Sequence, residues 1–148
     1  MASSTELTPV LVVALGIGFS VIFVAIWSSV CALIARVSGY RSLALFRIDS
    51  AAAAEGEALP SPDFAMIGPA RYRGHILKLR ASPGGLTLRI PKIFVFHPPV
   101  RVPWERVRED PAYHRILGRA ILLDERVRLG LPEETFEAIR TARARFAR

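Results

Sequence analysis

The chain has 148 residues, of which 51% are hydrophobic, and it carries 20 Lys and Arg against 13 Asp and Glu for a net charge of +7. Its only cysteine is Cys31, which excludes a disulfide framework and a cysteine-based zinc site. The length leaves room for one small folded domain beside a membrane anchor.

The first distinctive stretch is residues 7–35, which contain no charged side chain. About 20 apolar residues are enough to cross a bilayer core as a helix. We therefore expect a transmembrane helix over residues 9–35, with Thr8 as its N-terminal cap and Pro9 at its first position. Residues 1–8 would form a short external N-terminus.

Positive charge follows this stretch and does not precede it. Arg36, Arg41 and Arg47 come directly after the apolar residues. Basic residues next to a membrane helix stay on the cytoplasmic side, and a cleaved signal peptide would need a positive N-terminal region. The sequence therefore predicts one span, with the N-terminus outside and the C-terminal domain in the cytoplasm.

Small residues form a stripe along one face of the expected membrane helix. Its members recur at steps of three, four and seven and are Ala14, Gly18, Ala25, Ser28 and Ala32. Small side chains allow a second helix to approach closely within a membrane. We expect this face to pack against a larger membrane protein complex or another copy of the chain; the alternative is that composition alone produces the stripe.

Two connecting segments follow the span. Within residues 36–48, Tyr40, Leu43 and Phe46 recur at helical spacing, which indicates a juxtamembrane amphipathic helix. Such a helix would lie in the membrane interface or, alternatively, cover the soluble domain. Residues 49–69 are rich in Ala, Pro and acidic side chains and are expected to be a linker.

The cytoplasmic domain is expected to occupy residues 70–148, where the apolar residues begin to alternate with polar ones. Alternating runs on both sides of a turn at residues 82–85 predict a β-hairpin. Residues 93–96 form a short β-rich run. Residues 100–107 form a further strand, in which Pro103 indicates an edge position or a bulge.

The C-terminal third has a second hairpin and a closing helix. Apolar runs flank a polar turn at residues 124–126, whereas residues 111–118 are expected to be irregular or a single helical turn. Pro132 and the glutamates after it are typical of a helix start. Phe136 and Ile139, with Ala142 and Phe146, would form the buried face of that helix.

Together these elements predict an α+β protein, with one N-terminal transmembrane helix and a small antiparallel β-sheet capped by a C-terminal helix. Residues 72–146 resemble the pleckstrin-homology and GRAM-like domains of bacterial membrane proteins, in the hairpin ILKLRASPGGLTLRI, the strand VPWERV and the closing helix LGLPEETFEAIRTAR. The order SGYRSLALF, an Ala/Pro-rich segment, YRGHILKLRASPGGLTL and FHPPVRVPWERV is also similar to small single-span bacterial membrane proteins of unassigned function. The resemblance implies a location in the bacterial inner membrane and a domain that binds phosphorylated lipid headgroups or proteins. The lipid-binding form needs basic residues at the first hairpin, and its tip here is uncharged.

The charge of the domain indicates an anionic partner. Residues 64–148 hold 17 Lys and Arg against 8 Asp and Glu, and the nearest anionic surface is the inner leaflet of the membrane. The cations expected to contact an acidic partner or anionic lipid are Arg36, Arg41, Arg47, Arg71, Arg73, Lys78, Arg80, Arg140 and Arg143.

No motif for catalysis, for a metal or for a cofactor stands out. The three histidines lie far apart in the sequence, without carboxylates at metal-ligand spacing, and no nucleic-acid-binding motif accompanies the arginines. We therefore expect a non-enzymatic accessory or assembly subunit that docks on a larger membrane protein complex through its membrane helix and basic domain. The alternative is an inner-leaflet module that binds anionic lipid.

Overall fold

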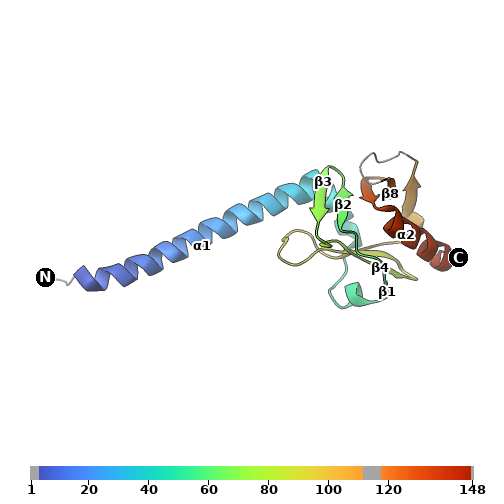
Figure 1. The fold of residues 1–148 in the computed structure, drawn as a ribbon. Coiled ribbons are helices and arrows are strands. Elements are labelled where there is room, and N and C mark those ends of the chain that lie inside the picture. Colours follow the sequence, from blue (N-terminus) through green and yellow to red (C-terminus); the bar gives the residue numbers. More distant parts are fainter. Residues whose placement is uncertain (1–3, 112–117, 148) are drawn as a thin grey trace.

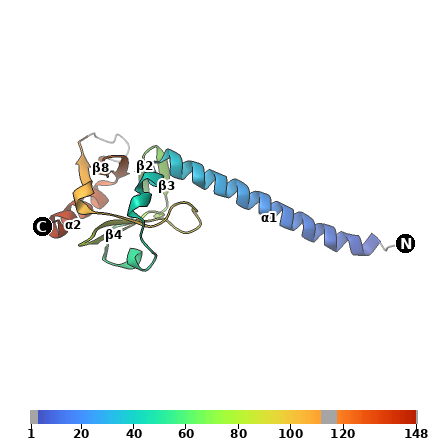
Figure 2. The same ribbon diagram turned by 180° about the vertical axis from the view of Figure 1, so that it is seen from behind.

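The computed structural model describes residues 4–111 and 118–147, and for residues 4–8 only the path of the backbone. A long helix, α1 (Ser4–Val37), projects from a β domain, and α2 (Glu133–Phe146) lies on the opposite side of that domain (Figures 1 and 2). The 3₁₀ helices are η1 (Tyr40–Phe46), η2 (Ala52–Ala54) and η3 (Trp104–Arg106). The strands are β1 (Glu57–Ala58), β2 (Phe64–Ile67), β3 (Ala70–Arg73), β4 (Lys78–Ser82), β5 (Gly85–Arg89), β6 (Val100–Val102), β7 (Val107–Asp110), β8 (Arg119–Leu123) and β9 (Val127–Leu131).

The strands form two antiparallel sheets, not the single curved sheet that the sequence predicts. Their orders are β1-β4-β5-β6 and β3-β2-β9-β8-β7. Both predicted hairpins are confirmed, as β4–β5 and β8–β9. The predicted strand over residues 100–107 is divided, because the chain leaves β6 at Pro103, turns through η3 and enters β7 in the other sheet. A proline cannot donate to a strand ladder, which favours the break at this point.

Helix α2 packs on strands of both sheets and closes the core. Phe136, Ile139 and Ala142 are buried, as the sequence predicts, while Phe146 is half-buried. Trp104 is 2% exposed in the same core, and its indole N–H donates to the carbonyl oxygen of Ser82 at 2.8 Å. The α+β class is therefore confirmed.

Helix α1 differs in its ends from the prediction. It begins at Ser4, so Thr8 is not its cap and Pro9 lies inside it; the proline removes only one hydrogen bond near the start of a long helix. The stretch Pro9–Val37 is 29 residues long and apolar enough to cross a membrane. Gly39 follows the helix with a φ of 76°, which a glycine adopts at little cost, and directs the chain into η1.

Residues 36–48 do not form the expected interfacial helix. They contain a seven-residue 3₁₀ helix, η1, that packs against β6 and β9. Tyr40 is 1% exposed and Leu43 is 0% exposed, so the apolar face covers the core of the β domain. The second alternative, a segment that caps the soluble domain, is the one that the structure shows.

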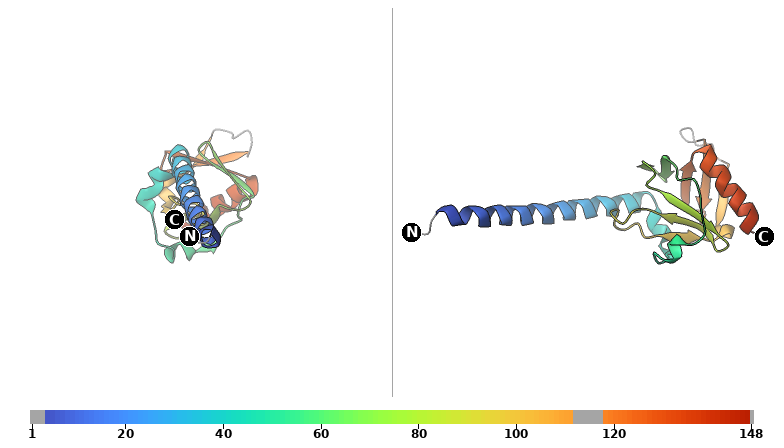
Figure 3. Two further views of the ribbon diagram at one scale, coloured as in Figure 1. Left: turned by 90° about the vertical axis from the view of Figure 1, so that its left-hand side faces the viewer. Right: turned by 60° about the horizontal axis from the view of Figure 1, so that its bottom comes forward.

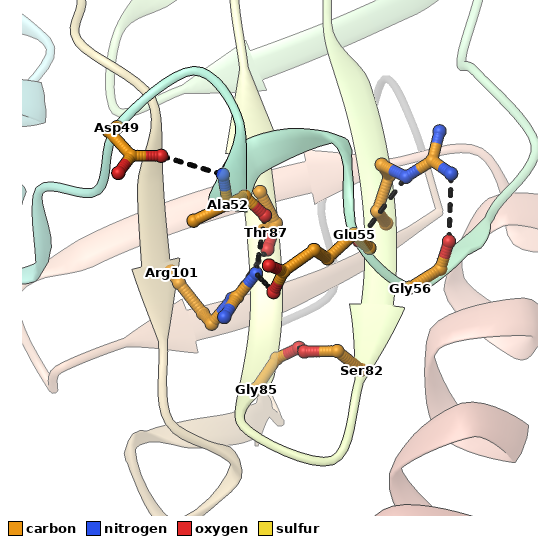
Figure 4. Close-up of polar contacts among 9 residues, drawn as sticks. Asp49, Ala52, Glu55, Gly56, Ser82, Gly85, Thr87 and Arg101 are labelled. Atoms are coloured by element: carbon orange, nitrogen blue, oxygen red, sulfur yellow. Dashed lines mark hydrogen bonds and ion pairs between the residues drawn. The ribbon is translucent and has the colours of Figure 1, made fainter.

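The expected linker over residues 49–69 is also wrong, because this segment is folded into the domain. Strand β1 pairs with β4, and β2 pairs with β3 and β9. Arg101 holds the preceding turn in place: it donates to the Ala52 carbonyl oxygen at 2.5 Å and to Thr87 Oγ1 at 3.2 Å, and pairs with Glu55 (Figure 4). The domain therefore begins at Tyr40 rather than at residue 70.

Residues 93–96 form turns instead of the expected β-rich strand. Backbone bonds join Phe94 N–H to the Pro91 carbonyl oxygen and His97 N–H to the Phe94 carbonyl oxygen. Pro91 and Pro98 flank the run and cannot donate to a strand ladder, which disfavours a longer strand through this segment. Most of the expected irregular segment 111–118 lies outside the described residues.

Candidate functional site at the junction of α1 and the β domain

The last third of α1 packs against the β domain. Cys31, Ala35 and Ser38 are buried, with exposures of 1%, 2% and 2%, whereas the α1 residues before Trp27 are exposed on every side where their side chains are described. Steps of three and four place these three residues on one face of the helix. We call this contact, together with the domain residues that meet it, the junction.

A cluster of rings forms the domain side of the junction. The His97 ring lies 5.0 Å from the Tyr40 ring, 6.1 Å from the Tyr72 ring and 6.3 Å from the Phe94 ring, measured between centroids. The Tyr72 hydroxyl and His97 Nε2 are 3.1 Å apart, and His97 Nδ1 lies 3.3 Å from the Val95 carbonyl oxygen. A neutral ring with its proton on Nδ1 satisfies both contacts, because Nε2 then accepts from the tyrosine.

Burial keeps the junction uncharged. Desolvation lowers the pKa of His97, and it raises the pKa of Tyr40 and of Tyr72 above the usual tyrosine value. The Tyr40 hydroxyl donates to the Pro98 carbonyl oxygen at 2.8 Å. These side chains are therefore neutral, hydrogen-bonded packing groups at the place where α1 meets the β domain.

The loop of residues 91–99 extends the junction along the helix toward its N-terminus (Figure 3). The Trp27 indole N–H donates to the Ile93 carbonyl oxygen at 2.8 Å, and the Trp27 and Phe94 rings are 5.9 Å apart. Ile93 and Phe96 nevertheless remain 65% and 60% exposed. The loop thus presents large apolar side chains beside the apolar helix.

A groove of about 330 Å³ opens where α1, η1 and this loop meet. We call it the junction groove; its lining residues are Ala32, Ala35, Tyr40, Arg41, Ala44, Arg47, Phe96 and Pro98. Its walls are mostly apolar, and two arginines supply its charge. A second groove shares Arg47, Phe96 and Pro98 with the junction groove and is also lined by Arg89 and Lys92.

The cations singled out in the sequence do not form one site. Arg41 and Arg47 line the junction groove, and Arg36 lies in the last turn of α1. The strand cations are Arg71 and Arg73 on β3 and Lys78 and Arg80 on β4. Arg140 and Arg143 lie on α2, away from α1 (Figure 1), and Arg140 pairs with Glu137 at 2.6 Å.

Lys92 was missing from the cations that the sequence singled out. Its position could be inferred, because Lys92 begins a segment between Pro91 and Pro98 in which residues 93–96 are all apolar and show no alternation of polar and apolar residues. Such a run between prolines favours an exposed apolar loop over a strand.

The small-residue stripe is not the face that contacts the domain. Ala32 is exposed while its neighbour Cys31 is buried, and Ser28 lies at the boundary, half-buried. Adjacent residues on a helix differ in direction by about 100°. The stripe that contains Ala14 and Gly18 therefore stays uncovered, about a quarter turn from the junction.

Comparisons with protein-family models, with curated proteins and with solved structures found no match. Within residues 4–111 and 118–147, no three His, Cys, Asp or Glu side chains are grouped to hold a metal ion. The fold and the junction define an α+β protein in which the C-terminal end of one long apolar helix packs onto a two-sheet domain.

Proposed function

We propose that this chain is a non-enzymatic, single-span protein of the bacterial inner membrane, and that it serves as an accessory or assembly subunit of a larger membrane protein complex. Its N-terminus lies outside and its pleckstrin-like domain lies in the cytoplasm. The observation that carries the proposal is the junction, where Cys31, Ala35 and Ser38 are buried against the domain. A domain fixed in this way presents one constant surface to a neighbour in the membrane.

The length of α1 supports this placement. The 29 residues of Pro9–Val37 extend about 43 Å at 1.5 Å per residue, and a bilayer with its headgroup regions is about 40–45 Å thick. The junction then lies at the depth of the cytoplasmic headgroups, with the β domain directly beneath the membrane.

The uncovered stripe on α1 supports a helical partner. Ala14, Gly18 and Ala25 remain exposed in the single chain, and close packing against small residues is a principal source of helix association in lipid. A partner helix at this face would also lie beside the basic domain.

The proposal is tested by topology and by co-purification. Protease added outside intact spheroplasts should leave the β domain whole, and digestion of the domain would reverse the orientation. Native mass spectrometry after mild detergent extraction should show a stoichiometric protein companion. Gly18→Leu should weaken that association by roughly 1 kcal/mol, whereas the matched control Ile22→Leu should not. Equal retention of the companion by both variants would remove the stripe from the proposal.

A second function, anionic-lipid binding at the inner leaflet, is favoured by the unpaired cations in the first part of the chain, of which Arg36, Arg41 and Arg47 lie beside the end of α1. Within the described residues, none of the Lys and Arg side chains between Arg36 and Lys92 forms an ion pair. Each such cation near an anionic leaflet contributes about 1 kcal/mol of attraction.

A further inference from the structure

We propose that the junction groove binds the phosphate of an anionic phospholipid, with Arg41 and Arg47 as the phosphate contacts. The inference rests on the proposed insertion of α1 into the membrane. It identifies the site and the ligand class for the lipid-binding function. The resemblance to pleckstrin-homology domains implies lipid binding at the first hairpin, and the junction groove is a different place.

The depth of the groove matches the phosphate layer. Ala35 and Ala32, which line it, lie two and five residues before the end of α1 at Val37. At 1.5 Å per residue these positions are about 3 Å and 8 Å above the helix end. Each headgroup region is about 5–8 Å thick, so the groove opens among the headgroups when α1 spans the bilayer.

The lining of the groove is complementary to such a lipid. Ala32, Ala44 and Phe96 supply apolar surface for the start of an acyl chain, while Arg41 and Arg47 supply donors for a phosphate. No Asp or Glu side chain is among the described lining residues. A volume of about 330 Å³ accommodates a headgroup and the first part of a chain, and the rest of the lipid would lie along α1 in the bilayer.

The 91–99 loop forms the wall of the groove that faces deepest into the membrane. Phe96 belongs to this wall and has a φ of 69°, an unusual conformation for a bulky side chain. The loop is bonded to Trp27, ten residues and therefore about 15 Å before the end of α1. Phe96, which lines the groove with Ala32 and Ala35, then lies among the headgroups, and Ile93 reaches about 7–10 Å beyond them into the acyl-chain region, where apolar side chains are favoured.

The test measures which lipid stays with the full-length protein. Wild-type protein is reconstituted into nanodiscs with equal amounts of phosphatidylcholine and phosphatidylglycerol, exchanged into detergent, and analysed by native mass spectrometry for retained lipid. We expect phosphatidylglycerol to be retained in preference to phosphatidylcholine. Arg41→Gln with Arg47→Gln should reduce that preference about 30-fold, since each cation contributes about 1 kcal/mol.

Arg140→Gln with Arg143→Gln is the matched control and should retain the wild-type preference, because these arginines lie on α2 at the other end of the domain (Figure 1). Ala44→Glu is a second test that leaves both arginines in place; Ala44 is exposed on η1, and its replacement by a carboxylate should also abolish the preference. Melting of each variant in detergent shows that it is folded.

Equal retention of the two lipids by the wild type, or unchanged retention by both groove variants, would overturn the proposal. These results are distinct from failure of the proposed function. A protein that is released from membranes by alkaline extraction has no spanning helix, whereas an integral protein without lipid preference refutes only the groove.

Discussion

The two parts of the chain around the β domain, before residue 93 and from residue 101 onward, use their basic side chains differently. In the part of the chain from Arg36 to Lys92, the cations have no carboxylate partner within the described residues. From Arg101 onward most of the described arginines are paired; Arg106 with Asp124 and Arg140 with Glu137, for example, are each 2.6 Å apart.

This contrast separates charge that is cancelled within the fold from charge that is available to an external anion. The carboxylate of Asp124 is 8% exposed, so its arginine partner offsets a nearly buried negative charge. Exposed pairs add little stability, but they reduce the field that an arginine presents to its surroundings. The cations without a carboxylate partner are therefore mainly those from Arg36 to Lys92, among them Arg41 and Arg47 in the junction groove.

The largest expected effect concerns whether residues 38–63 belong to the folding unit of the β domain. A fragment of residues 64–148 lacks Tyr40, Leu43 and Ala53, which are 1%, 0% and 0% exposed in the core. Losing several core side chains at about 2–5 kcal/mol each exceeds the stability of a small domain. We expect that fragment not to melt cooperatively by circular dichroism, whereas residues 38–148 should. Cooperative melting of the shorter fragment would instead support the expectation that residues 49–69 are a linker.

The next effect concerns the core that joins the two sheets. Trp104→Ala should destabilise the full-length protein in detergent by about 3–5 kcal/mol, because the indole is 2% exposed and also loses its bond to Ser82. Ile93→Ala removes a side chain that is 65% exposed and should leave thermal stability almost unchanged. Equal melting temperatures for the two variants would contradict the described core.

A smaller effect is expected in the pH dependence of stability, which depends on the buried, neutral His97 in the junction. Because burial lowers the pKa of His97, the unfolded chain takes up a proton below about pH 6.5 that the folded chain does not. Stability should therefore fall as the pH decreases from about 6.5 to the folded pKa of His97, by at most about 1.4 kcal/mol per pH unit. Tyr40 and Tyr72, which face the ring, stay neutral in this range because their pKa values are raised.

The measurement is the melting temperature in detergent at pH 7.5 and pH 5.5. His97→Gln should show a smaller loss than the wild type, because the carboxylates common to both proteins cancel in the comparison. A loss of the same size in both proteins would show that His97 is not held neutral.

The smallest effect is expected at the far end of the domain. Arg140→Ala with Arg143→Ala should change the free energy of unfolding by less than about 1 kcal/mol, since Arg140 takes part only in an exposed pair with Glu137. From the sequence these two arginines were expected to contact the anionic partner. The measurement is salt-dependent binding of the double variant to anionic liposomes. Unchanged binding would assign the attraction to the cations from Arg36 to Lys92.

Features with local causes could be predicted from the sequence. The uncharged stretch after Glu6 indicates a long apolar helix, the turn at residues 82–85 indicates a hairpin, and Pro132 with the glutamates after it indicates the start of the last helix. Each depends on residues that are neighbours in the chain, through apolar length, turn conformation or helix-end charge. The closeness of Arg41 and Arg47 to the end of the long apolar helix could be predicted for the same reason.

Tertiary structure decided where residues 36–69 lie and which cations stay unpaired. Tyr40 looks like part of an interfacial helix until Pro98, 58 residues later, accepts its hydroxyl bond. Ala52 looks like part of a linker until Arg101 binds its carbonyl oxygen from β6. An amphipathic or alanine-rich segment can pack against any complementary surface. Here strands that are distant in the chain supply that surface, β6 and β9 for η1 and β6 for Ala52. Because the partners are distant in the chain, the sequence does not show which arginines pair with a carboxylate and which remain unpaired.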